Sequence, residues 1–244
     1  MAKALVLNSS PRRDRGGTGQ VLAPMVAGMR AAGAEVELAY PHGMAVGYCR
    51  GCYHCWTATP GRCVQRDDMD ALLPQVADSD ILVLATPLYV DGMNAAMKAV
   101  LDRLIPVLQP FIVEHEDHCR HDLVPGCRAG RVALVSVCGF SELDNFEPLV
   151  AHVKAACRNL RREYAGALLR PYAGSLAGLA RHGLAVGEVL DACREAGREL
   201  VRDGRISEAT ATSAGRELVS RRQHIAAVNH HFRAAISRNR PAGA

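Results

Sequence analysis

Aromatic side chains are scarce in this sequence: they make up 5% of its 244 residues, and Trp56 is the single tryptophan. Ala, Val, Leu and Gly supply most of the apolar content, which favours helices packed on a sheet over a β-sandwich. Long hydrophobic runs are also lacking, because no stretch approaches the ~18 apolar residues that a membrane span needs. We therefore expect one globular core with a small appendage, and no membrane partner.

The N-terminus, Met1–Asn8, carries one basic residue and a short apolar run, so we interpret it as a first β-strand and not as a secretion signal. We accordingly expect a cytoplasmic protein. The chain contains nine cysteines. In a reducing compartment a cysteine cluster is more often a metal-binding or catalytic site than a disulfide framework.

Positive charge is concentrated at the C-terminus. The formal net charge is +4, but residues 205–244 contain seven Arg and two Glu, so residues 1–204 carry a net charge of −1. Nucleic-acid binding would depend on this tail alone, and we favour a solvated or subunit-facing helix instead. We predict a main domain over 1–204 and a basic helical extension over 205–244.

Short apolar segments alternate along the chain with longer segments of helical periodicity. The predicted strands are 4–7, 36–39, 81–85, 132–137 and 167–169 with its flanks. The predicted helices are 20–32, 68–77, 93–108, 146–162 and 187–203, with one or two more over 207–237. This alternation predicts an α/β fold with a doubly wound parallel sheet. Ligands of such sheets bind at the carboxyl ends of the strands, which here means just after residues 7, 85 and 137.

The loop after the first strand, Asn8–Gly19, combines hydroxyl groups, glycines and arginines where a helix begins. Unpaired backbone N–H groups, positive potential and a lack of bulky side chains are what a phosphate group requires. The loop contains neither the Gly-Lys-Ser/Thr of a P-loop nor the G-x-G-x-x-G dinucleotide pattern. From these residues alone, a phosphate site and an ordinary polar turn are equally good interpretations.

Two further loops follow the third and fourth core strands. In the segment Thr86–Arg103, Pro87 and Gly92 allow a tight loop to approach a flat ring. The segment Ser136–Glu142 contains Cys138, and a lone cysteine at a strand end is more often buried than reactive.

Together these loops resemble those of the NADPH-dependent FMN reductase and iron–sulfur flavoprotein families. Ser10-Pro11-Arg12 with Gly17-Thr18 is similar to their phosphate loop, although Asn8-Ser9 replaces the usual glycine. The resemblance implies a flavodoxin-like fold, with a five-stranded parallel sheet in the order 2-1-3-4-5, helices on both faces and FMN at the carboxyl edge. It also implies that 1–204 is the FMN-binding domain. The implied cofactor-binding residues are Ser10, Arg12, Thr18, Gly19, Gln20, Thr86, Pro87, Leu88, Tyr89, Val90, Gly92, Met93, Ser136, Cys138, Gly139 and Phe140.

Four cysteines fall within fifteen residues, in the spacing C-x2-C-x2-C-x7-C. Four thiolates this close make a site suited to iron–sulfur or zinc. Iron–sulfur flavoproteins ligate a [4Fe–4S] cluster with a similar motif, so the resemblance implies Cys49, Cys52, Cys55 and Cys63 as ligands. Three alternatives stay open: a [4Fe–4S] cluster, a metal-free loop and zinc. The neighbouring Trp56 either shields a cluster, stacks near the flavin edge or simply packs.

We predict an FMN-dependent oxidoreductase that takes electrons from NAD(P)H as co-substrate and passes them to a small-molecule acceptor, such as a flavin, quinone, nitro or azo compound. No catalytic side chain is assigned, because the flavin supplies the chemistry. The alternative is an iron–sulfur flavoprotein that carries electrons from ferredoxin without using NAD(P)H directly. The family resemblance also implies a homodimer or homotetramer.

Three other groups of polar residues have simpler interpretations. The segment 114–122 is rich in potential metal ligands but lacks helical spacing, so we interpret it as a solvated loop between a helix and a strand. His230 and His231 have the same interpretation. Asp67 and Asp68 are interpreted as caps of the helix that follows them.

Overall fold

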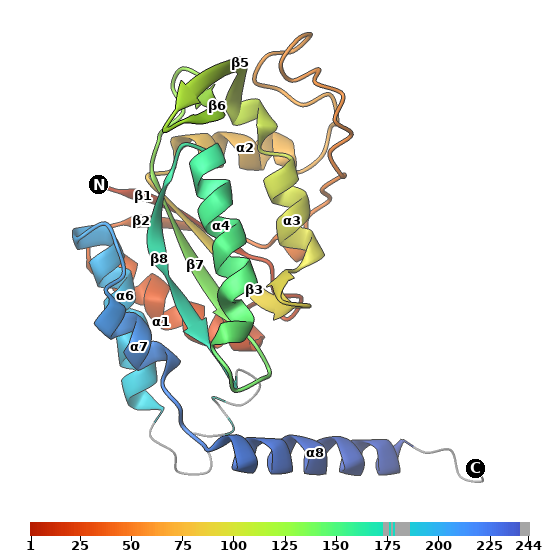
Figure 1. Cartoon of the computed structure of the whole chain (residues 1–244), viewed down its shortest axis with the longest axis vertical. Helices are drawn as coiled ribbons and strands as arrows, with labels where there is room; N and C mark the ends of the chain where they lie inside the picture. Colours follow the sequence, from red (N-terminus) through yellow and green to blue (C-terminus); the bar gives the residue numbers. More distant parts are fainter. Residues whose placement is uncertain (173–175, 177, 179–185, 240–244) are drawn as a thin grey trace.

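Five parallel strands form the centre of the computed structural model, which describes residues 1–172, 176, 178 and 186–239 (Figure 1). These strands are β1 (Lys3–Asn8), β2 (Glu35–Ala39), β3 (Ile81–Tyr89), β7 (Arg131–Val137) and β8 (Glu163–Arg170). They pair in the order β2-β1-β3-β7-β8. Because these are the first to fifth core strands of the chain, the predicted order 2-1-3-4-5 is confirmed.

Helices cover both faces of this sheet. On one face lie α1 (Gly17–Ala31) and α6 (Gly187–Arg202), and on the other lie α2 (Met69–Asp78), α3 (Ala95–Asp102) and α4 (Glu147–Asn159). Successive side chains of a strand point to opposite faces, so Val83 packs in the first layer and Leu84 in the second. Burial on both faces explains why these strands are nearly continuous apolar runs.

Two glycines bring α1 and α6 into close contact. A Cβ added to Gly28 would lie 1.9 Å from the carbonyl oxygen of Arg194, and one added to Gly197 would lie 2.0 Å from that of Met25. Only glycine permits such an approach, so these residues fix the position of α1 against the sheet and with it the loop that precedes α1.

The predicted helix over 93–108 is wrong in its extent. The chain forms β4 (Gly92–Met93), then the shorter helix α3, the 3-10 turn η3 (Ile105–Val107) and the strand β5 (Leu108–His115). Pro106 follows the last turn of α3 and cannot continue a helix, because it lacks an N–H donor. The remaining 3-10 turns of the described residues are η1 (Arg13–Arg15), η2 (Pro41–Gly43) and η4 (Asp144–Phe146).

The segment 114–122 is a β-hairpin and not a solvated loop, which corrects the sequence interpretation. β5 pairs antiparallel with β6 (His118–Leu123) in a separate two-stranded sheet. Glu116 and Asp117 form its turn with φ of 52° and 58°, the left-handed conformation that a two-residue type I′ hairpin loop requires.

The C-terminal extension contains two helices among the described residues, α7 (Glu208–Gly215) and α8 (Arg221–Arg238). The side chain of Arg170, at the end of β8, donates hydrogen bonds to the carbonyl oxygens of Ala214 (3.2 Å) and Arg216 (2.6 Å), which ties the end of α7 to the sheet. Figure 1 shows α8 beyond the carboxyl edge, apart from the layers of the domain. In the described part of the chain, no helix combines the length and apolar character that crossing a bilayer demands.

Candidate functional site

A pocket of about 170 Å³ opens at the carboxyl edge of the sheet, where the loops after β1, β3 and β7 meet. We call it the edge pocket. Its lining residues are Ser10, Pro11, Arg12, Gly17, Thr18, Pro87, Leu88, Tyr89, Val137, Cys138 and Gly139. Arg12 is the charged residue of this lining, so it contributes positive potential. The three loops are distant in sequence, and the order of the strands brings them together as predicted.

The first loop of the edge pocket is a tight backbone cradle at the start of α1. Gly16 precedes the helix and supplies no side chain to cap it. The hydroxyl of Thr18 is buried and has no hydrogen-bond partner in the part of the chain that the structure describes. A Cβ on Gly16 would lie 2.8 Å from Ser10 Oγ, and one on Gly19 would lie 2.5 Å from the backbone of Asp14. Unpaired donors in so narrow a cradle fit a phosphate group.

Buried hydrogen bonds join the three loops behind the pocket. Asn94 Nδ2 donates to the carbonyl oxygen of Ser9 (2.6 Å), and the backbone N–H of Asn94 donates to Thr86 Oγ1 (3.1 Å). Ser136 Oγ donates to the carbonyl oxygen of Thr86 (3.0 Å). The predicted residues Thr86 and Ser136 therefore hold the loops together and do not line the pocket. The sequence analysis did not identify Asn94 as a residue of the site, although its position directly before a helix is an N-cap signal.

Several other predicted residues lie around the edge pocket without lining it. Val90 follows Tyr89 at the tip of the hairpin between β3 and β4, where its side chain is fully exposed. Phe140 is also exposed, on the loop after β7. Outside the lining there are also Gly19 and Gln20 in the first turn of α1, and Gly92 and Met93 in β4.

Cys138 is the one thiol in the pocket lining. Its side chain is buried, and its Sγ lies 3.4 Å from the carbonyl oxygen of Phe140. Burial raises the pKa of this thiol, so it is protonated and neutral at pH 7. The structure therefore agrees with a buried cysteine and not with an activated nucleophile.

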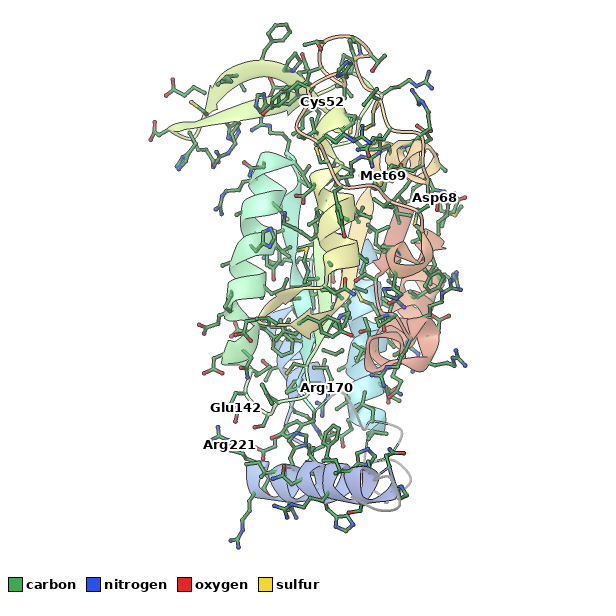
Figure 2. The ribbon with its side chains drawn as sticks, turned by 90° about the vertical axis from the view of Figure 1, so that its right-hand side faces the viewer. Cys52, Asp68, Met69, Glu142, Arg170 and Arg221 are labelled. Carbon is green, nitrogen blue, oxygen red and sulfur yellow. The ribbon has the colours of Figure 1, made fainter. Side chains whose placement is uncertain are left out.

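The four predicted metal ligands lie at the opposite end of the molecule. They belong to residues 44–68, a segment without helix or strand between η2 and α2, which we call the cysteine loop. Figure 2 shows Cys52 at one end and Arg170, Glu142 and Arg221 at the other. Cys49 and Cys52 are exposed, whereas Cys55 and Cys63 are partly buried.

A buried ion pair holds the base of the cysteine loop. Arg103, just after α3, has a side chain that is only 1% exposed, and its guanidinium contacts both carboxylate oxygens of Asp67, at 2.7 and 3.0 Å. It also donates to the carbonyl oxygen of Gly47 (2.7 Å). Burial by itself would raise the pKa of Asp67, but hydrogen bonds from Arg103 and from the N–H groups of Gly47 and Met69 lower it overall.

The two acidic residues before α2 have different partners. Asp67 Oδ1 accepts a hydrogen bond from the N–H of Met69 (3.1 Å), so its predicted contact with the helix start is confirmed. Asp68 instead accepts from the N–H of Ala45 (2.7 Å) and makes no capping bond with its side chain. The interpretation of Asp68 as a cap by its side chain is wrong, because this carboxylate closes the cysteine loop.

Trp56 packs under the β5–β6 hairpin. Its Nε1 donates to the carbonyl oxygen of Leu108 (2.8 Å), and its ring lies 5.2 Å from that of Tyr53 and 4.8 Å from that of His121, measured between centroids. Trp56 therefore packs at the end of the sheet opposite to the edge pocket, where Figure 1 shows this hairpin.

As arranged here, the four thiols do not form a ligand set for a metal or cluster. Among the residues that the structure describes, no three His, Cys, Asp or Glu side chains converge on a common point. They do lie within electrostatic range of one another: burial raises the pKa of Cys55 most, and Cys63, Cys49 and Cys52 raise it further. The residue types suit a thiophilic metal, whereas the geometry does not.

A second hollow, of about 740 Å³, lies between the β5–β6 hairpin and the end of α4. Arg120, Arg158 and Arg161 are among its lining residues, which include none of the predicted site residues. It is larger than the edge pocket but lies away from the carboxyl ends of the strands, where ligands of this fold bind. We therefore choose the candidate functional site by its place in the fold and not by the volume of the cavity.

Comparison with known proteins identifies a family that matches about half of the chain. Residues 2–121 match the sequence model of the NADPH-dependent FMN reductase family. This match confirms the resemblance. It includes the loops after β1 and β3 and the whole cysteine loop, and it ends before β7.

Curated relatives match over less than half of this chain. An iron–sulfur flavoprotein of Archaeoglobus fulgidus is 38% identical over 104 residues, which are 43% of this chain and 46% of that protein. An iron–sulfur flavoprotein of Methanocaldococcus jannaschii is 28% identical over 105 residues, 43% of this chain and 53% of that protein. The chain spans about half the length of the curated relatives it matches.

Solved structures extend the likeness to most of the fold. An FMN-dependent NADH-azoreductase from Bacillus anthracis, solved in complex with FMN, aligns with a TM-score of 0.59 at 14% identity. The alignment covers 83% of this chain and 100% of the azoreductase chain. An NAD(P)H:quinone oxidoreductase from Methanothermobacter marburgensis aligns with a TM-score of 0.60 at 15% identity, covering 82% and 98%. At these identities the alignments show a shared flavodoxin-like fold.

Proposed function

We propose that this chain binds FMN in the edge pocket and works as an FMN-dependent oxidoreductase with NAD(P)H as its electron donor. One observation carries the proposal: the N-terminus of α1, which no side chain caps, and the Pro87–Tyr89 loop meet in one pocket. In that pocket the buried Thr18 hydroxyl has no hydrogen-bond partner among the described residues. The match of residues 2–121 to the FMN reductase family supports the proposal.

The residues of the edge pocket divide into two sets. Ser10, Arg12, Thr18 and the first N–H groups of α1 would hold the phosphate, because they offer hydroxyls, a positive charge and unpaired amides. The Pro87–Tyr89 loop and Gly139 would hold the ring. Bound FMN would supply the hydride acceptance from the nicotinamide and the electron transfer to the acceptor.

The rest of the chain would position these groups and shape the mouth of the pocket. The hydrogen bonds of Asn94 and Ser136 fix the loops before any ligand arrives, so little ordering is needed on binding. The exposed rings of Tyr89 and Phe140 offer apolar contact to a flat acceptor such as a quinone, nitro or azo compound. All nine cysteines are free thiols, which suits the reducing cytoplasm that we propose as its location.

The test begins with the visible spectrum of the purified protein. We expect flavin absorbance, either as isolated or after incubation with FMN, and its bleaching by NADPH or NADH without oxygen. Gly19→Ala should abolish FMN retention, because the new Cβ would lie 2.5 Å from the backbone of Asp14. Gly187→Ala is the matched control, since no atom of the described residues lies within 4 Å of the added Cβ. A wild-type protein that remains colourless after incubation with FMN would overturn the proposal.

A second candidate function is an iron–sulfur flavoprotein that carries electrons from ferredoxin. The 38% identity to an iron–sulfur flavoprotein, together with four thiols on one loop, favours it. After anaerobic reconstitution we then expect bound iron and sulfide, reduced in Cys52→Ser and Cys55→Ser but not in Cys119→Ser, an exposed cysteine of β6. Wild-type protein without iron after this treatment would contradict it. Flavin reduced by ferredoxin and not by NAD(P)H would favour the carrier over the reductase.

A further inference from the structure

The hollow between the β5–β6 hairpin and the end of α4, of about 740 Å³, is rich in arginine, and we call it the arginine hollow. Its charged lining residues are Arg120, Arg158, Arg161, Arg162, Glu116 and Asp122. Four arginines against two carboxylates give a net charge of +2 when the lining histidines are neutral. The thiol of Cys157, which also lines the hollow, is neutral at pH 7 because burial raises its pKa to about 11. The lining therefore carries an excess of positive charge.

The arginine hollow lies at the amino edge of the parallel sheet. Ala129 and Arg162, two of its lining residues, come just before β7 and β8. Figure 1 shows the β5–β6 hairpin and the end of α4 at this end of the molecule, away from the carboxyl edge. The described residues that line the arginine hollow and the edge pocket are entirely different. A ligand here would therefore occupy a site separate from the one proposed for FMN.

Carboxylates neutralise little of this positive charge. In the described part of the chain, Arg161 is the only arginine of the hollow with a carboxylate within ion-pair distance: its Nη2 lies 3.6 Å from Asp122 Oδ1. Both side chains are partly exposed, and such pairs contribute little. Arg120 donates instead to the carbonyl oxygen of Cys119 (2.9 Å), which carries no net charge.

Arg162 adds a buried positive charge to the lining. It is 6% exposed, and its guanidinium donates to the carbonyl oxygens of Val76 (2.6 Å) and Ser79 (3.1 Å), at the end of α2. These hydrogen bonds hold the guanidinium in place without neutralising it. Because salt screens a buried charge less than an exposed one, Arg162 should attract an anion more strongly than a surface arginine does.

A second charged hollow of the molecule shows the opposite arrangement. It has a volume of about 590 Å³, lies between α6 and α7, and contains three arginines and three acidic residues. Each arginine there is paired with an acid of the same hollow: Arg194 with Asp191, Arg198 with Glu195 and Arg216 with Glu188. Arginines alone therefore do not make a hollow positive, and the arginine hollow differs because its guanidinium groups lack such partners.

Arg161 occupies a backbone position that favours glycine. It follows α4 with φ of 54°, the left-handed conformation in which glycine usually ends a helix. The N–H of Arg162 closes this turn by donating to the carbonyl oxygen of Cys157 (3.0 Å). A residue with a Cβ adopts this conformation at a cost in free energy, so an arginine at this position points to a use for its guanidinium.

We propose that the arginine hollow binds a small polyanion that carries two or more phosphate groups. Arginine presents a planar fork of N–H donors that matches two oxygens of one phosphate. Arg120 stands on β6 and Arg158 on α4, so linked phosphates can contact both walls. The volume lies in the roughly 300–1,000 Å³ range of small-ligand sites, and the net charge of +2 calls for a multiply charged ligand. This site does not rest on the proposed function.

The test is an isothermal titration of the full-length protein with pyrophosphate at constant ionic strength. We expect a dissociation constant of roughly 100 µM or less, weakened about 100-fold or more in Arg158→Met with Arg161→Met. The matched control, Arg194→Met with Arg198→Met, removes the same charge from the paired hollow and should bind as the wild type does. Equal losses in the two double variants would overturn the proposal, because net charge alone would then account for binding.

Arg12→Ala separates this site from the edge pocket, whose phosphate cradle could also take pyrophosphate. The affinity of the arginine hollow should persist in this variant. Loss of binding in Arg12→Ala, with binding kept in Arg158→Met with Arg161→Met, would place the anion in the edge pocket and overturn the proposal. Neither outcome bears on FMN binding, which is measured separately by flavin absorbance.

Arg161→Gly covers the case in which the double variant unfolds. Glycine suits the left-handed backbone at this position, so the melting temperature should not fall. Pyrophosphate affinity should still fall about 10-fold or more. Unchanged affinity in this variant would overturn the proposal. Citrate, a polyanion of carboxylates, should bind more weakly than pyrophosphate, and equal or tighter binding of citrate would overturn the assignment to phosphate.

Discussion

At the carboxyl edge of the sheet the pocket is lined by loops that leave fully buried strands, whereas at the opposite end four thiols lie on a loop without helix or strand. The two ends differ in what fixes their residues. Hydrogen bonds between adjacent strand ends, such as that of Ser136 to Thr86, fix the edge pocket. The cysteine loop depends on Arg103, which reaches it from the end of another element.

This difference separates a site that is formed before its ligand arrives from one that its ligand would have to assemble. Backbone amides at the end of a buried strand have one position, so the edge pocket exists without FMN. Thiols on an irregular loop converge only when a metal offsets the cost of ordering them. The comparison therefore predicts that a substitution at one end of the molecule alters the site at that end and leaves the site at the other end unchanged.

The largest effect on stability is expected at the end of the molecule that holds the cysteine loop. Arg103→Met leaves the largely buried carboxylate of Asp67 without its cation, which should lower the free energy of unfolding by about 3–5 kcal/mol. FMN affinity should not change, because the edge pocket lies at the opposite end. Urea denaturation and an FMN titration measure the two quantities. The control is Arg66→Met, which breaks the exposed pair with Asp70 and should cost at most about 1 kcal/mol.

The same pair gives a pH dependence with a defined sign. The pKa of Asp67 is lowered in the folded protein, so its contribution to stability is complete at neutral pH. It should disappear as the pH falls from about 4 through the lowered pKa. In Arg103→Met this acid-sensitive part should be reduced. Equal acid sensitivity of the wild type and Arg103→Met would show that the ion pair does not hold the cysteine loop.

An intermediate effect is expected at the edge pocket. Arg12→Ala removes a charged hydrogen-bond donor from the lining and should weaken FMN binding about 10- to 100-fold, corresponding to roughly 1.5–3 kcal/mol. Stability and iron content should not change. Arg15→Ala, in the same turn but outside the lining, is the control. Equal losses of affinity in both variants would mean that general positive charge, and not contact with the phosphate, accounts for binding.

The smallest effect concerns backbone strain beside the pocket. Val90 has φ of 48°, a left-handed conformation that a β-branched residue adopts at a cost. Val90→Asn should raise the free energy of unfolding by up to about 1 kcal/mol, because Asn tolerates this conformation. Val64→Asn, at an exposed position without positive φ, should change little. Thermal melts at one protein concentration compare them, and a destabilised Val90→Asn would contradict the strain argument.

The parts of the fold that the sequence predicted correctly are those with strong local patterns of apolar residues. Continuous apolar runs such as 81–85 and 132–137 identified the central strands, and their alternation with helical segments gave the parallel sheet. The β5–β6 hairpin was missed because an apolar segment that follows a helix can continue it or begin a strand, and periodicity does not separate these cases over a few residues. Pro106 was the signal that could have divided them.

The candidate site was predictable to a similar degree. The loops that line the edge pocket follow predicted strands, so topology alone brought Thr18, Pro87 and Cys138 together. The burial of Arg103 could not be predicted, because arginine is mostly a surface residue and its partner Asp67 lies 36 positions away.

By itself, the sequence determined which segments form the sheet and the edge at which the pocket opens, because periodicity and composition act over neighbouring residues. The order of the strands was implied by the family resemblance of the loops. Only the tertiary structure decided that the cysteine loop lies at the far end from that pocket and that α8 begins beside the pocket lining. These placements depend on contacts between distant residues, Arg103 with Asp67 and His224 with Gly139, whose free energies no local pattern records.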